Sequence, residues 1–324
     1  MPGAWRLPLG LIAIGVFFFV PFAAAKDEYP TKPIEIFVGF APGGATDTVI
    51  RVIAPPLQKN LGVSVVIVNK PGASGSVAAK QVSHAVPDGY TLLCVPIQHT
   101  IFPAITANPP YSIQDFEPIG RLVTSPMVIM VNPNSPWKTL DELIEHARKN
   151  PAKLKAGVAG VGSVGNMIFE IIKRKANIEI IQMPFTSEID ALTAVLGGHA
   201  DFCANSLGIS TAHIKSGRLK ALAATCPKRF PLIPEIPTVA ELGYPEAAIS
   251  TYVGMLAPRK VPKERLTKLY KVCQAAITDS EAIASLEKVG FVADYLNAPD
   301  FQKFLVTHYE QFRKIAEEAK IVVR

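Results

Sequence analysis

The alternation of strand-like and helix-like segments constrains the fold of this chain more than any other feature of its sequence. Short apolar runs at residues 34–38, 63–68 and 90–95 are separated by helix-like segments at residues 46–60 and 76–84. Parallel strands need a crossover between them, and a helix is the usual crossover. This order therefore predicts an α/β unit with a mostly parallel sheet and covering helices.

A second series of segments further along the chain follows the same order. Strands are predicted at residues 154–159, 178–182, 200–204 and 219–224. Helices are predicted between them, at residues 166–175, 188–196 and 206–215. Amphipathic helices are predicted near the C-terminus, at residues 262–278 and 299–320. We therefore expect two α/β units within one chain.

Two apolar strands connect the predicted units. Residues 126–133 form an apolar run bracketed by prolines, and residues 249–258 form another. We expect a discontinuous first domain of residues 26–126 plus 251–324, with a second domain of residues 127–250 inserted between two crossing hinge strands. A two-lobed protein with paired hinges would close over a ligand.

Residues 1–25 have the three-part layout of a secretory signal peptide. Arg6 precedes an apolar run, and the segment ends in alanines at residues 23–25. A membrane-spanning helix needs roughly 20 apolar residues, whereas Pro21 interrupts this run. The sequence predicts export and a mature start near Lys26, and the alternative is an uncleaved membrane anchor.

Charge and composition argue against a nucleic-acid partner and a metal site. The net charge of +6 is modest, and the basic residues are scattered, which suits anionic small molecules better than nucleic acid. The six histidines never fall at metal-ligand spacing with one another or with a cysteine pair. We expect the cysteines to be mostly unpaired core residues, with a structural disulfide as the alternative: Cys94, Cys203, Cys226 and Cys273.

Two glycine-rich turns follow neighbouring predicted strands. Residues 39–47 read GFAPGGATD, and residues 69–76 read NKPGASGS. Glycines let backbone N–H groups approach a ligand, and the N-terminus of the following helix carries a partial positive charge. Each turn alone is also ordinary turn chemistry, but two on one sheet edge predict a cradle for an anion.

Residues 160–165 read GVGSVG, which matches the glycine pattern of dinucleotide-binding turns. That class of site needs an acidic residue at the end of the following strand. Glu179 instead falls at the beginning of that strand, and residues 182–184 at its end are Gln, Met and Pro. A further turn for a small anion is therefore favoured over a nucleotide site, and we expect no cofactor.

The sequence resembles the periplasmic solute-binding components of tripartite tricarboxylate transporters, often called Bug proteins. The resemblance covers essentially all of the chain after residue 25, and its motifs occur in the family's order at residues 29–38, 41–47, 69–75, 87–93, 196–199, 213–223 and 236–243. It implies a type II periplasmic-binding-protein fold, the two-lobed Venus flytrap. It also implies a periplasmic, monomeric protein that captures an organic anion, commonly a carboxylate, and hands it to a membrane permease.

The resemblance also assigns a ligand site. The residues implied are Phe40, Gly43, Gly44, Thr46 and Asp47 of the first turn, Gly72, Ala73, Ser74 and Gly75 of the second, Gln98 and His99, Ser163, Gly165, Asn166 and Asn205 of the second domain, and Tyr252 of the hinge strand. Asp47 is acidic, so we interpret it as holding the turn and capping the helix rather than touching an anion.

Two departures from the family's pattern bear on the ligand. Where many relatives carry Phe-Asp, this chain has Ala204 and Asn205, and in the family an acid there is associated with ammonium-bearing ligands. The change argues against an amino-acid ligand and leaves no acidic group identified in the cleft. Where relatives have small residues, residues 95–99 read VPIQH, which predicts a bulkier and more apolar lining.

Two other classes of function compete with a transport receptor. An enzyme has no motif to support it: residues 72–76 lack the final glycine of a nucleophile elbow, and neither a zincin motif nor a P-loop occurs. The paired carboxylates at residues 141–142 and 317–318 fall on polar helix faces. We therefore expect a binding protein, with a periplasmic sensor for a signalling receptor, or less strongly a secreted enzyme, as the alternatives.

Overall fold

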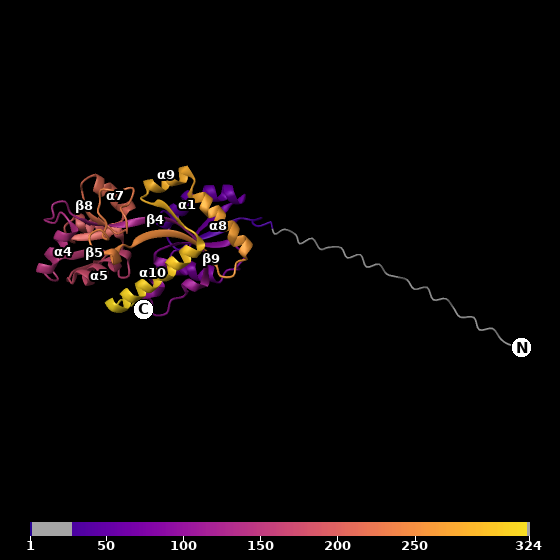
Figure 1. Ribbon diagram of the computed structural model, residues 1–324, viewed down its shortest axis with the longest axis horizontal. Helices are drawn as coiled ribbons and strands as arrows, with labels where there is room; N and C mark the ends of the chain where they lie inside the picture. The colour runs from indigo at the N-terminus through magenta and orange to yellow at the C-terminus, as the bar shows by residue number, and fades with distance from the viewer. Residues whose placement is uncertain (2–27, 323–324) are drawn as a thin grey trace.

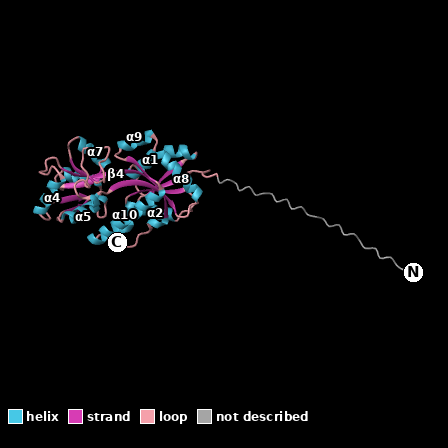
Figure 2. Ribbon diagram, viewed as in Figure 1, coloured by secondary structure: helices cyan, strands magenta, loops and turns pink. Residues whose placement is uncertain are grey.

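The computed structural model describes residue 1 and residues 28–322, so the predicted signal peptide lies outside the described residues apart from Met1. The described chain forms two α/β lobes joined by long strands (Figure 1). Strands lie at the centre of each lobe and helices cover them on the outside (Figure 2). The predicted α/β fold with two lobes is confirmed.

The first lobe begins with the predicted alternation of strands and helices. Its elements are β1 Ile34–Val38, α1 Ala45–Leu61, β2 Val65–Asn69, α2 Ser76–Ser83, β3 Thr91–Pro96 and α3 Gln98–Ile105. β1 lies between β2 and β3 and pairs with both in parallel. The carboxyl ends of these strands therefore meet at one sheet edge, where the two glycine-rich turns begin.

The second lobe repeats this arrangement. Its elements are α4 Leu140–Lys149, β5 Lys155–Val158, α5 Val164–Ala176, β6 Ile181–Pro184, α6 Glu188–Leu196, β7 Phe202–Ser206, α7 Leu207–Lys215 and β8 Lys220–Ala224. β5 pairs in parallel with β6 and with β7. β7 and β8 both pair antiparallel with a strand that arrives from the first lobe, so the sheet is mixed at that edge.

Two antiparallel strands, β4 Phe116–Val131 and β9 Ser250–Pro258, cross between the lobes. β4 pairs with β9 up to Pro126 and with β7 from Met127 onwards. The sequence analysis predicted that this strand starts at residue 126. This start is wrong, because β4 begins at Phe116. Pro118 and Gly120 interrupt the apolar pattern but sit at a register shift, where a strand tolerates them.

The C-terminal segment returns to the first lobe and also reaches the second. Its elements are α8 Lys263–Ile277, α9 Ser280–Lys288, β10 Val292–Leu296 and α10 Ala298–Ala319. β10, which the sequence did not predict, pairs antiparallel with β4. α10 packs against α3 and β4, and Glu318 near its end pairs with Arg174 of α5.

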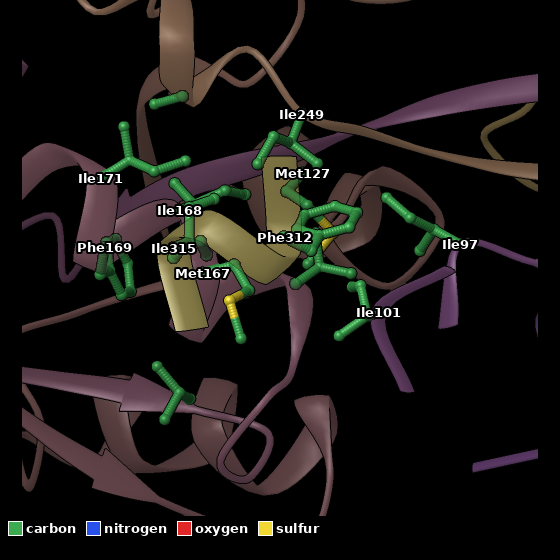
Figure 3. Packing of buried hydrophobic residues seen from close by; sticks show 14 of the residues in the cluster. Ile97, Ile101, Met127, Met167, Ile168, Phe169, Ile171, Ile249, Phe312 and Ile315 are labelled. Carbon is green, nitrogen blue, oxygen red and sulfur yellow. The ribbon is translucent and has the colours of Figure 1, made fainter. Parts of the chain in front are cut away.

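One apolar core connects the two lobes. Phe312 and Ile315 of α10 lie among Ile101 of α3 and Met167 and Ile168 of α5 (Figure 3). Phe312 is fully buried, and truncating a buried phenylalanine costs about 3–5 kcal/mol. Side chains from both lobes therefore belong to one buried core.

The cysteines agree with the sequence prediction. All four are buried and unpaired. Within the described part of the chain, no group of side chains has the composition of a metal site. None of the helices there is long and apolar enough to cross a membrane.

Candidate ligand-binding site

A cavity of about 270 Å³ lies where the two lobes face each other. Its lining residues come from the turns after β1, β2 and β5, from α3, β4 and β7, and from the starts of α5 and α6: Phe40, Ser74, Gln98, Ile101, Phe102, Ile105, Met127, Ala159, Val161, Gly162, Ser163, Val164, Gly165, Glu188 and Ala204. The cavity is large enough for a small organic molecule.

The turn after β1 is held by Asp47. The Asp47 carboxylate accepts hydrogen bonds from the Gly43 N–H and from Arg51, both at 2.8 Å, and from the Asn69 amide at 2.8 Å. Burial alone would raise the pKa of Asp47, but the hydrogen bonds from Arg51, Gly43 and Asn69 outweigh it and lower the pKa below its usual value. Asp47 therefore stays ionised and organises the turn. The helix cap that the sequence analysis also gave to Asp47 is not found, because the N-cap of α1 is Gly44 and has no side-chain cap hydrogen bond.

The turn after β2 carries unusual backbone strain beside the cavity. Four successive residues have positive φ: Gly72 (141°), Ala73 (43°), Ser74 (55°) and Gly75 (87°). Residues other than glycine in this region cost of order 1–3 kcal/mol each. Such strain persists where the surrounding structure enforces it, and here it places Ser74 in the cavity lining.

The two turns are packed directly on each other. A Cβ atom on Gly39 would lie 2.5 Å from the Cα atom of Gly75, so neither backbone could approach the other if residue 39 had a side chain. The glycines therefore serve close packing of the two turns, in addition to any approach to a ligand.

The second lobe contributes the N-terminus of α5. The Ser163 hydroxyl accepts a hydrogen bond from the Asn166 N–H at 3.3 Å and caps the helix. The Asn166 side chain accepts from the Gly162 N–H at 2.8 Å and so holds the preceding turn. The N–H groups of Val164 and Gly165 have no hydrogen-bond acceptor among the described residues, and both residues line the cavity.

Open N–H groups at the start of a helix suit an anion. The partial positive charge of a helix N-terminus favours a negative group by about 0.3–1 kcal/mol when exposed. A side chain at residue 165 would obstruct this start of the helix, because a Cβ on Gly165 would lie 2.9 Å from the carbonyl oxygen of Ala204.

Glu188 also lines the cavity, and the sequence analysis missed it. Its Oε2 atom accepts hydrogen bonds from the Ser206 N–H at 2.9 Å and from the Ser206 hydroxyl at 2.7 Å. The expectation that the cleft has no acidic group is therefore wrong. The signal that could have found Glu188 is its position at the junction of β6 and α6, the same kind of junction that drew attention to the other turns.

The predicted site residues separate into two groups. Those that line the cavity are Phe40, Ser74, Gln98, Ser163 and Gly165. The other predicted residues are outside its lining: Gly43, Gly44, Thr46, Asp47, Gly72, Ala73, Gly75, His99, Asn166, Asn205 and Tyr252. The structure therefore brings one predicted residue of each glycine-rich turn, Phe40 and Ser74, into one site with the start of α5, and the other predicted residues of both turns are outside the lining.

Several of the residues outside the lining are buried, among them Tyr252, Asn205 and His99, which pack against neighbouring side chains or make structural hydrogen bonds. Tyr252 is fully buried and packs edge-on against Phe304, with ring centroids 5.2 Å apart. The Asn205 side chain is also fully buried, and its amide donates to the Glu188 carbonyl at 2.7 Å. His99 stacks on Tyr111, and burial lowers the pKa of His99 to about 3, so its ring is neutral.

Part of the cavity lining is apolar. The apolar side chains that line it are Ile101, Phe102 and Ile105 of α3, Met127 of β4, and Val161 and Val164 of the second lobe. The sequence predicted an apolar lining from residues 95–99, but of these only Gln98 lines the cavity. The apolar wall comes instead from the helix that this segment begins. An aliphatic part of a ligand would fit between these side chains.

Comparison with known proteins gives the family. A model of the tripartite tricarboxylate transporter family receptor matches residues 49–321. The UPF0065 protein in the TAR-I ttuE-ttuC' intergenic region of Agrobacterium vitis is 31% identical over 92% of this chain and 87% of its own length. BugT of Bordetella pertussis is 28% identical over 95% of this chain and 96% of its own length.

Solved structures agree with this match. The periplasmic binding protein BugD is 31% identical, with a TM-score of 0.75 over 91% of this chain and 100% of that chain. An R. palustris protein solved with adipate is 28% identical, with a TM-score of 0.78 over 91% and 99%. MatC from Rhodopseudomonas palustris, solved with bound malate, is 27% identical, with a TM-score of 0.74 over 89% and 99%. The chain therefore belongs to the tripartite tricarboxylate transporter receptor family.

Proposed function

We propose that this protein is a periplasmic solute-binding protein that captures a small organic carboxylate between its lobes and delivers it to a tripartite tricarboxylate-type membrane transporter. The observation that carries the proposal is the cavity between the lobes, in which Ser74 of the first lobe and the open N–H groups at the start of α5 meet. Backbone donors at helix N-termini suit a carboxylate. The solved relatives with adipate and malate support this ligand class.

Ligand capture in this proposal depends on closure of two domains. We propose the division into residues 26–126 plus 251–324 and residues 127–250. The change of pairing partner along β4 between Pro126 and Met127 supports a boundary there. The crossing strands β4 and β9 would act as the hinge, because a bound anion would contact both lobes and favour the closed state.

Calorimetric titration of the exported protein against succinate, malate, adipate and their monocarboxylate analogues tests the binding step. We expect saturable binding of at least one of these acids and no chemical conversion of it. Failure of every carboxylate to bind, or turnover of a bound one, would contradict the proposal. Carboxylate uptake by cells with and without the gene then separates delivery to a permease from sensing.

A further inference from the structure

From the position of Glu188 we propose that this protein selects a carboxylate whose other end carries a hydrogen-bond donor, an ammonium or a hydroxyl group, over a dicarboxylate. The inference rests on the proposed function, because it concerns the same cavity. The lining contains one acidic side chain among the described residues, and this is Glu188.

The hydrogen bonds of Glu188 leave one carboxylate oxygen available. Both bonds that the described residues donate to the carboxylate, from the Ser206 N–H at 2.9 Å and the Ser206 hydroxyl at 2.7 Å, end on Oε2. Oε1 therefore has no donor from the described residues. Two donors on one oxygen hold the side chain in one orientation. The free Oε1 is then a fixed acceptor for a donor group of a ligand.

The backbone around Glu188 makes this orientation rigid. The carbonyl oxygen of Glu188 accepts the Asn205 amide at 2.7 Å, and Asn205 is fully buried. Ser187, directly before it, caps α6 by accepting the Asp190 N–H at 3.1 Å. Glu188 is thus fixed at both its main chain and its side chain, as a residue that determines specificity must be.

The other lining residues suit the carboxylate end and the spacer of such a ligand. The N–H groups of Val164 and Gly165 are open for one carboxylate, and the apolar side chains of α3 suit an aliphatic spacer. A second carboxylate on the ligand offers no donor to Oε1 of Glu188 and would meet another carboxylate there, whereas an ammonium or hydroxyl group would donate to it. A ligand with both types of end satisfies both parts of the cavity.

Titration of matched acids tests this inference. The probes share a chain length within each set and differ only at one end: adipate, 6-aminohexanoate and 6-hydroxyhexanoate, and likewise succinate, 4-aminobutyrate and 4-hydroxybutyrate. We expect the donor-bearing member of the best-fitting set to bind at least tenfold more tightly than the dicarboxylate. Glu188→Gln should shrink that ratio at least tenfold, because it removes the charge that attracts the donor and repels the carboxylate.

Asp190→Asn is the matched control, because Asp190 lies on the same helical turn outside the cavity lining and the substitution changes the net charge equally. It should leave the ratio unchanged. A wild-type preference for the dicarboxylate, or a Glu188→Gln variant that weakens all members of a set equally, would overturn the inference while leaving carboxylate binding intact. Failure of every carboxylate to bind the wild type would overturn the proposed function, and the inference with it.

Discussion

The side-chain amide of Asn69 donates a hydrogen bond of 2.8 Å to Oδ1 of Asp47 and thereby fastens the turn after β2 to the turn after β1. The same amide donates to the carbonyl oxygen of Phe40 at 3.1 Å. Phe40 and Ser74, one from each turn, line the cavity. The positions of these two turns therefore depend on the Asp47 carboxylate, which does not line the cavity itself.

We predict that Asp47→Asn lowers both stability and ligand affinity. Hydrogen bonds to a charged group contribute about 1.5–3 kcal/mol, and the loss of charge weakens those from Gly43 and Arg51. Urea unfolding should show a loss of this order. Asp300→Asn, which changes an exposed acid in the first turn of α10, should cost much less. Equal losses in the two variants would contradict the role given to Asp47.

The contribution of Asp47 should depend on pH in a defined direction. The pKa of Asp47 is lower in the folded protein than its usual value of 3.8. A lowered pKa gives stability that is present above the unfolded value and is lost as the pH falls through the folded value. The difference in unfolding free energy between the wild type and Asp47→Asn should therefore be constant above about pH 5 and shrink below pH 3.8. A gap that widens on acidification would show that another group is responsible.

Ser163→Ala should weaken ligand binding more than its effect on stability explains. Ser163 caps α5 in the cavity lining, and Thr139 caps α4 in the same way outside it, so Thr139→Ala is the control. Loss of a serine or threonine cap costs about 0.5–2 kcal/mol of stability, so both alanine variants should lose comparable stability. Only Ser163→Ala should also lose affinity for the carboxylate that binds best, measured by calorimetry. Equal affinities in the two variants would show that Ser163 does not contribute to ligand binding.

The two-lobed α/β fold could be predicted from the sequence, because each strand and helix of its two α/β units follows from a local pattern of residues. The glycine turn before α1 and the alternation of apolar runs are readable residue by residue. The start of β4 at Phe116 and the whole of β10 were missed, because both are fixed by pairing with strands far away in the sequence. Pairing between residues far apart in sequence leaves no local pattern. In β4, Pro118 and Gly120 also interrupt the apolar pattern that is typical of a strand.

The site was predictable where backbone turns form it and unpredictable where side chains had to be placed in space. Ser74, Ser163 and Gly165 follow strands directly, and all three line the cavity. Tyr252 and Asn205 were placed by their alignment with the family's pattern, but both side chains point into buried packing. Glu188 was missed because its role follows from the position of Ser206 in the next strand, which the sequence does not show.

The N-terminal prediction is open to direct test. Residues 1–25 have the charge, apolar run and alanine tail of a signal peptide. We expect the protein purified from the periplasm of an expressing bacterium to begin near Lys26. N-terminal sequencing or intact mass measures this start. An intact Met1 on protein from the cytoplasmic fraction would contradict export.

The lobes touch at Gly162 and Ile105, and this contact gives a test of closure. A Cβ on Gly162 would lie 2.3 Å from Cδ1 of Ile105, so either the Ile105 side chain moves into the cavity that it lines or the lobes separate. Both changes should hinder closure over a ligand, so Gly162→Ala should weaken ligand binding. Gly160→Ala is the matched control, since Gly160 also has positive φ but a Cβ there would meet only the Phe185 carbonyl oxygen at 3.9 Å.

Solution scattering measures the expected difference. The wild type and Gly160→Ala should become more compact at saturating carboxylate, because the bound anion joins the two lobes. Gly162→Ala should compact less, and adding Ile105→Ala to it should restore compaction by removing the atom that the new Cβ meets. Backbone strain alone would affect both glycine variants alike, and the double variant would then show no recovery. Identical scattering of the wild type with and without ligand would mean that the crossing strands β4 and β9 do not act as a hinge.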